Sequence, residues 1–225
     1  MKRFKADWNT IVFWLVFATL ALSAVYTAVQ IAQSAPDVPA GGGKSRGDYT
    51  IMLLKCILGM GILFLPTIMT RRFNVEIPRA MAIAYAVFLY SAIYLGEVQV
   101  FYDRIPHWDT ILHAFSGGML GAFGFIVVAV LNRQSSVKIK LSPLFESVFA
   151  FCFALSIGVL WEVYEFTIDG ALGLNMQRFR LATGEQLIGR AALIDTMKDL
   201  ITDGIAAFVV TFSRFAMPRG RKKAV

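Results

Sequence analysis

Three groups of ionisable residues in this 225-residue chain are spaced so that their side chains would share one face of a helix. The groups are Asp109 with His113, Glu162 with Glu165, and Asp195 with Asp199 and Asp203. Members of each group are three or four residues apart, the interval at which helical side chains are neighbours. Carboxylates and imidazoles bind divalent cations and serve as general acids and bases. The spacing therefore indicates a metal site or acid–base chemistry.

Helix capping is a competing explanation for two of these residues. Asp109 and Asp195 each begin an apolar segment, where a carboxylate caps free N–H groups and contributes about 0.5–2 kcal/mol. Glu162 and Glu165 fall near the C-terminal end of a segment, where the helix dipole disfavours negative charge. The predicted roles are metal ligation for His113, Glu162, Glu165, Asp199 and Asp203, and catalysis as a base or as a support for the ligands for Asp109 and Asp195.

The chain that must position these residues is unusually apolar. Hydrophobic residues make up 57% of it and charged residues 16%, and its mean hydropathy is +0.62. Soluble domains carry about 25% charged residues, and a globule this apolar would expose large adhesive patches. Cys56 and Cys152 both lie in apolar runs, which argues against a disulfide framework. The composition excludes a soluble domain and predicts an integral membrane protein.

Six apolar stretches are long enough to cross a bilayer, which requires about 20 residues in a helix. They cover approximately residues 11–31, 50–70, 80–98, 110–131, 144–168 and 194–216. The first is longer than the core of a signal peptide, which has about 7–15 apolar residues, so it is expected to be a retained anchor. The prediction is an all-α, polytopic bundle of six transmembrane helices that forms a single membrane domain over residues 1–225.

Basic residues predict the direction in which the helices run. With the N-terminus inside, 14 of the 22 Lys and Arg residues flank the inner helix ends together with three acidic residues. The inner side then carries +11 and the outer side −4 of the net charge of +7. This asymmetry follows the positive-inside rule, so both termini are expected in the cytoplasm. Because the basic balance is a topology signal, nucleic acid is not an expected partner.

Most of the ionisable residues outside the inner loops fall at the outer ends of the last four spans. Both histidines, His107 and His113, belong to this set, although His107 lies in a Pro-His-Trp turn and is expected to be interfacial. The longest outer loop, residues 169–193, is polar, and its mildly amphipathic part at 181–192 is a candidate for a short interfacial helix. Ionisable side chains at membrane depth cost a few kcal/mol each and tend to mark function. The outer ends are therefore the expected site.

An ordered set of short motifs resembles a known family. The motifs are Tyr102-Asp103, Trp108-Asp109, His113, Ser116-Gly117, Trp161-Glu162 with Glu165, Asp195-Thr196-Met197 with Asp199, and Asp203-Gly204. Spread over residues 50–216, they resemble the bacterial inner-membrane proteins typified by YjdF, a family of unknown function that is distantly similar to VanZ-like membrane proteins. A polar insertion around 172–190 is a departure from that pattern. The resemblance implies a multi-pass protein of the bacterial inner membrane and supplies no reaction.

A divalent-metal site at the outer membrane face is the leading hypothesis for function. Carboxylates with one imidazole favour Mg²⁺, Mn²⁺ or Fe²⁺ over Zn²⁺. Such an ion could polarise a phosphoryl or ester group and activate water. The substrate would be a lipid headgroup or a cell-envelope intermediate, but no hydrolase motif identifies an enzyme. Two alternatives stay open: a cation- or proton-coupled transporter, and a structural or partner-binding membrane protein with a buried ion network. A homo-oligomer is compatible with each hypothesis.

Overall fold

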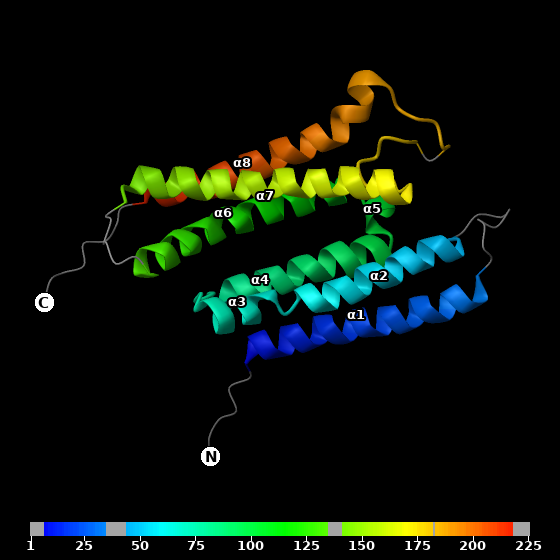
Figure 1. The fold of residues 1–225 in the computed structure, drawn as a ribbon, viewed down its shortest axis with the longest axis horizontal. Helices are drawn as coiled ribbons and strands as arrows, with labels where there is room; N and C mark the ends of the chain where they lie inside the picture. The colour runs from blue at the N-terminus through cyan, green and yellow to red at the C-terminus, as the bar shows by residue number, and fades with distance from the viewer. Residues whose placement is uncertain (1–6, 35–43, 135–140, 182, 218–225) are drawn as a thin grey trace, which may run out of the picture. The chain divides into compact units, whose positions relative to one another are not determined.

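The computed structural model describes residues 7–34, 44–134, 141–181 and 183–217. Regular structure in these residues is helical, apart from an isolated antiparallel bridge between Arg180 and Gln186. The chain divides into two compact units, Met1–Trp108 and Asp109–Val225 (Figure 1). Each unit has its own set of packed helices.

Three helical elements of the first unit pack on its N-terminal helix. In chain order the elements are α1 (Trp8–Gln33), α2 (Arg46–Ile62), α3 (Leu65–Phe73), α4 (Arg79–Leu89), the π-helix η1 (Tyr90–Val98) and α5 (Phe101–Arg104). Helix α1 contacts α2, α4 and η1. The buried core comprises Val16, Leu20, Leu63, Ala86 and Leu89.

One ion pair joins α2 to η1 within the first unit. Lys55 Nζ lies 2.5 Å from Glu97 Oε1, with both side chains about three-quarters buried. Lys44 Nζ also donates to the Glu97 carbonyl oxygen at 3.3 Å. Glu97 ends a span, where helix capping could not explain a carboxylate. The ion pair with Lys55 supplies the stabilising contact for the carboxylate.

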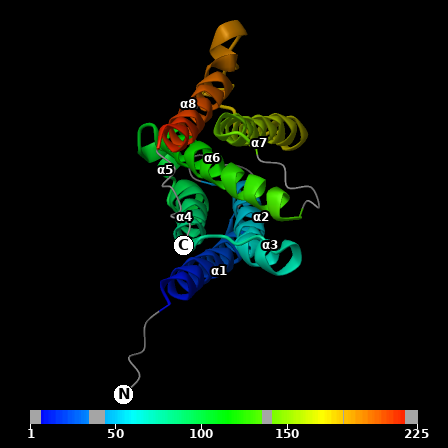
Figure 2. The same ribbon diagram turned by 90° about the vertical axis from the view of Figure 1, so that its left-hand side faces the viewer.

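The second unit is built on three long helices, α6 (Trp108–Gln134), α7 (Pro143–Leu172) and α8 (Ile194–Ala216), with a short 3₁₀ helix η2 (Gly189–Leu193) before the last. Figure 1 and Figure 2 both show these three helices side by side. Ser142 begins α7, because its side chain accepts a hydrogen bond from Phe145 N and Pro143 occupies the first turn. Gly173 ends α7 in a left-handed conformation, with φ of 68°.

Glycines allow the three helices of the second unit to approach closely. A Cβ atom on Gly124 of α6 would lie 2.6 Å from Ala150 Cα of α7, and one on Gly117 would lie 2.7 Å from the Asp203 carbonyl oxygen of α8. On α7, a Cβ on Gly158 would lie 2.6 Å from Asp203 Oδ2. Small residues let helix backbones meet in lipid. Here they enclose Asp203 between α6 and α7.

The predicted spans agree with the helices that the structure describes. Among the described residues, five segments are long and apolar enough to cross a membrane: Trp8–Gln33, Arg46–Phe73, Arg79–Val98, Trp108–Arg133 and Pro143–Leu172. The polytopic, all-helical architecture is therefore confirmed. Helix α8 coincides with the sixth predicted span but carries three aspartates, so its crossing of the membrane stays a prediction. The single domain over residues 1–225 also stays a prediction.

One local expectation is wrong and a second is confirmed only in part. The outer loop was expected from residue 169, but α7 continues to Leu172, so Asp169 is a buried helical residue. The amphipathic stretch 181–192 was a candidate for a short helix. In its described part, Gly184 adopts a positive φ inside a turn closed by the Arg180–Gln186 bridge, and only the 3₁₀ helix Gly189–Leu193 follows. A glycine turn cannot continue a helix, which explains the difference.

Candidate metal centre

His113 lies at the centre of the polar cluster, where α6 and α8 meet. Its Nδ1 atom is 3.2 Å from Asp203 Oδ2, and the Ser116 hydroxyl approaches Asp203 Oδ1 at 3.4 Å. An ionised carboxylate can only accept, so His113 donates its Nδ1–H to Asp203. In the neutral imidazole this hydrogen bond places the proton on Nδ1, so that Nε2 has the lone pair that could bind a metal ion.

The free Nε2 atom of His113 faces two further carboxylates. It lies 3.9 Å from Asp109 Oδ1 and 3.9 Å from Asp199 Oδ2. These distances are too long for hydrogen bonds. One ligand atom from each of the three residues lies within 4.8 Å of the other two. Metal–ligand bonds of about 2.0–2.6 Å allow two ligands of one ion to lie up to about 4–5 Å apart, so the three groups could hold a divalent cation.

Burial makes this arrangement costly without a compensating charge. Asp199 and Asp203 are each 3% exposed and His113 is 7% exposed, whereas the Asp109 side chain is 21% exposed. Buried carboxylates are stable only when they are paired or coordinate a cation. The greater exposure of Asp109 places the accessible side of the site next to it.

Two glutamates of α7 extend the cluster. Glu162 Oε2 accepts from Gln177 Nε2 at 3.2 Å, while Glu162 Oε1 is buried and accepts no hydrogen bond among the described residues. Glu165 Oε1 accepts from Trp161 Nε1 at 2.9 Å. Both glutamates interact electrostatically with His113 and Asp109. An orphaned oxygen on a residue that is 4% exposed is unusual in a folded protein and marks a place where a cation or proton would be stabilised.

The loop after α7 is tied to this cluster. The Asp169 carboxylate accepts from Met176 N at 2.8 Å and from Gln177 N at 3.0 Å. Gln177 Nε2 also donates to Thr196 Oγ1 of α8 at 2.9 Å. The next residue, Arg178, has a left-handed backbone with φ of 48° and places Nη2 3.7 Å from Asp109 Oδ2. The loop therefore contributes a guanidinium to the edge of the site.

Comparison with known proteins identifies the family of this chain but no reaction. The model of a family described as "Predicted membrane protein (DUF2238)" matches residues 12–219, which is most of the chain. The chain belongs to the DUF2238 family. An uncharacterized protein of Thermotoga maritima is 28% identical over 161 residues, which cover 70% of this chain and 73% of that protein. No solved structure matches. DUF2238 membership confirms the prediction of an integral membrane protein from a family of unknown function.

The second unit of this DUF2238 protein brings the predicted site residues together. Asp195 interacts electrostatically with Asp109, His113 and Glu162, although it lies outside the three-residue group that could share one ion. The roles assigned to the seven residues stay predictions. They are Asp109, His113, Glu162, Glu165, Asp195, Asp199 and Asp203.

Sequence reasoning missed three contributions to the site. Gln177 and Arg178 lie in the polar loop, which lacks a periodic pattern that could assign them to the cluster. Residue 169 was expected as the start of the outer loop, but the Asp169 carboxylate accepts hydrogen bonds from the backbone of that loop. An acidic residue four positions before the helix-ending Gly173 was the available signal.

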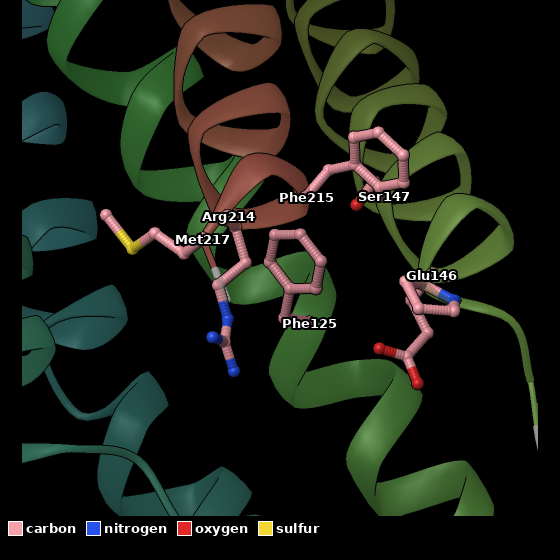
Figure 3. A pocket seen from close by; sticks show the side chains of 7 residues that line it. Phe125, Glu146, Ser147, Arg214, Phe215 and Met217 are labelled. Carbon is pink, nitrogen blue, oxygen red and sulfur yellow. The ribbon is translucent and has the colours of Figure 1, made fainter. Parts of the chain in front are cut away.

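A separate cavity lies at the other end of the same three helices. It has a volume of about 280 Å³ and is lined by residues that include Phe125, Glu146, Ser147 and Arg214 (Figure 3). Ser147 lies in the second turn of α7, whereas Glu162 lies 15 residues further, about 22 Å along a helix. The cavity shares no residue with the His113 cluster and brings together no comparable set of metal ligands among its lining residues. It is not the candidate site.

Proposed function

We propose that the second unit holds a divalent cation on Asp109, His113 Nε2 and Asp199. The observation that carries the proposal is the imidazole geometry: Asp203 holds Nδ1, so Nε2 is directed at two carboxylates 3.9 Å away. Carboxylate–histidine pairs that support a bound metal have this arrangement. The buried, unpartnered Glu162 Oε1 is an independent sign that the cluster has capacity for positive charge.

This proposal changes two of the predicted roles. Asp109 becomes a ligand rather than a base, because its Oδ1 faces Nε2. Asp203 becomes the partner that orients His113, because its Oδ2 binds Nδ1 instead of the ion. Glu162 and Glu165 remain ligands of a second ion or proton acceptors beside the first, and Asp195 remains the base candidate.

The donor set favours Mg²⁺, Mn²⁺ or Fe²⁺ over Zn²⁺, because two carboxylates and one imidazole form a predominantly oxygen site. A bound ion would polarise a phosphoryl or ester group and lower the pKa of a coordinated water. The protein's own residues would orient the imidazole, neutralise charge and restrict access to the side of Asp109.

We further propose that this site opens at the extracytoplasmic face of a bacterial inner membrane, with both termini in the cytoplasm. The inner-to-outer charge asymmetry of +11 to −4 supports that orientation. A lipid headgroup or a cell-envelope intermediate is the substrate that could reach the site. Kinship with YjdF-type and VanZ-like proteins is part of the same proposal.

The orientation is tested with the variant Glu185→Cys in a background without Cys56 and Cys152. The introduced cysteine should react with an impermeant maleimide on intact cells. Labelling only after lysis would show that the loop faces the cytoplasm and would contradict the proposed orientation.

Metal binding is tested directly on purified protein in lipid nanodiscs. Wild type should bind about one Mn²⁺, detected by electron paramagnetic resonance, and Asp199→Asn should reduce the affinity at least tenfold. Glu185→Gln removes the same charge from the exposed outer loop and should leave the affinity unchanged. Equal, substoichiometric Mn²⁺ in all three proteins would refute the metal centre.

A structural ion network is the competing function that a specific observation favours. A protonated His113 would pair with Asp203, as Arg178 pairs with Asp109, and such pairs could stabilise the helices without an ion. A cation that binds only the folded state raises its thermal stability. A melting temperature that is the same in Mn²⁺ and in chelator would favour the network.

The transport alternative is tested by cation flux in proteoliposomes, which Asp203→Asn should abolish.

A further inference from the structure

We propose that the ligand bound beside the metal is a phosphoryl group, and that Arg178 binds its oxygens. The inference rests on the proposed metal centre. Asp109 Oδ1 faces His113 Nε2 at 3.9 Å, while Asp109 Oδ2 lies 3.7 Å from Arg178 Nη2. One oxygen of the Asp109 carboxylate thus faces the proposed metal site, and the other faces the guanidinium. A ligand at the exposed edge of Asp109 can contact both.

The guanidinium is held in this place by the loop that carries it. Asp169 fixes the backbone of Met176 and Gln177, and the Gln177 side chain joins Thr196 to the Glu162 carboxylate. Arg178 follows directly. Its left-handed backbone, an uncommon conformation for a residue other than glycine, turns its side chain back to Asp109. Two helices therefore determine where the guanidinium lies.

Exposure and charge favour an anionic ligand. The Arg178 side chain is 44% exposed, so it faces the accessible edge of the site rather than its interior. A divalent cation together with Arg178 would bring three positive charges to a site whose nearest carboxylates are Asp109, Asp199 and Asp203. The cation and Arg178 would then be the two positive groups that an anionic ligand could contact at this edge. The same carboxylates without the cation would repel an anion.

The geometry favours phosphoryl over carboxylate ligands. A phosphoryl group presents three acceptor oxygens, of which one can meet the ion and two can meet the guanidinium fork. A carboxylate has two oxygens and cannot satisfy both partners fully. Arginine is suited to bidentate recognition of phosphate, which lysine cannot reproduce. Phosphate binding should therefore depend on the guanidinium as well as on the metal.

The test uses full-length protein in phosphatidylcholine nanodiscs loaded with Mn²⁺, and inorganic phosphate as the probe. Bound Mn²⁺ accelerates the ³¹P relaxation of any phosphate next to it. We expect wild type to give a saturable enhancement and Arg178→Gln to lower phosphate affinity by about tenfold or more, with Mn²⁺ affinity within about threefold of wild type. Arg178→Lys should fall between them. Arg190→Gln, an equal charge change at an exposed position in the same loop, should behave as wild type.

The results separate this inference from the metal proposal. Failure of wild type to bind Mn²⁺ refutes the metal centre and removes the basis of the inference. Mn²⁺ binding without saturable phosphate relaxation overturns the inference alone. It is also overturned if acetate competes as well as phosphate, or if Arg178→Gln weakens Mn²⁺ and phosphate binding equally, because Arg178 would then only support the metal ligands.

A further comparison identifies the source of the phosphoryl group. Phosphatidic acid is included in the nanodiscs at increasing fractions while the ³¹P signal of inorganic phosphate is followed. Displacement of inorganic phosphate by the lipid, dependent on Arg178, supports a lipid headgroup as the ligand. Unchanged phosphate binding supports a water-soluble phosphoryl compound. Both results support phosphoryl recognition.

Discussion

Adding one methyl group at Gly158 tests whether Asp203 controls the metal centre through His113. A Cβ at Gly158 would lie 2.6 Å from Asp203 Oδ2, which is about 0.8 Å closer than the 3.4 Å at which ordinary contact begins. The carboxylate cannot retreat freely, because α6 approaches the Asp203 backbone at Gly117. It must rotate, and the present 3.2 Å contact with His113 Nδ1 would be lost.

Two effects of Gly158→Ala follow from this displacement. Overpacking of a closely packed contact costs about 1–3 kcal/mol of unfolding free energy. Loss of the hydrogen bond that orients a metal-binding histidine lowers metal affinity by about 10–100-fold. Thermal unfolding in detergent and Mn²⁺ titration measure the two effects separately. Gly170→Ala is the matched control, because its Cβ on the same helix would meet nothing within 4 Å.

Three outcomes would contradict the proposed role of Asp203. If Gly158→Ala binds Mn²⁺ as tightly as wild type while Asp199→Asn loses binding, the metal site does not depend on the Asp203–His113 contact. A loss of stability with unchanged metal affinity would assign Asp203 a packing role only. Equal losses in Gly158→Ala and Gly170→Ala would show a general response of α7 to alanine rather than the local clash.

Two other contacts give measurable expectations. Asp169→Ala removes the acceptor for Met176 N and Gln177 N, and we expect faster amide hydrogen exchange in the loop after α7, with about 1–3 kcal/mol less protection; unchanged exchange at both amides would contradict this. For the Lys55–Glu97 pair, a double-mutant cycle of Lys55→Met and Glu97→Gln should show a coupling of about 1 kcal/mol in thermal unfolding. Additive effects would show that the pair contributes no net stability.

Several features of this fold follow from residue spacing because they are local. The apolar runs locate the spans, since length and hydropathy alone decide whether a helix can cross a bilayer. The four-residue interval brings Asp109 and His113 to one face within a single helix, and the structure retains that relation at 3.9 Å. Breaks in the regular helix within two of the spans were harder to predict from the sequence. Pro66 lies in the first turn of α3, which follows the end of α2, and η1 has π-helical geometry.

Contacts between distant segments could not be read from spacing. The same periodicity is compatible with Asp199 or Asp203 as the ligand, because both share a face of α8. Close approach at Gly117 and Gly158 decides the choice by placing Asp203 against Nδ1 of His113. Arg178 is a comparable case, because a polar loop has no periodicity that would direct one arginine to Asp109.

The sequence by itself determined that this is an apolar, helical membrane protein whose acidic residues and His113 gather at one set of helix ends. Composition, helix length and side-chain periodicity are properties of single segments, so they can be read without a fold. Only the tertiary structure decided which atom of His113 meets which carboxylate, and that Arg178 stands beside Asp109. Those relations depend on how α6, α7, α8 and the loop between α7 and α8 pack, and packing is set by interactions across the whole unit.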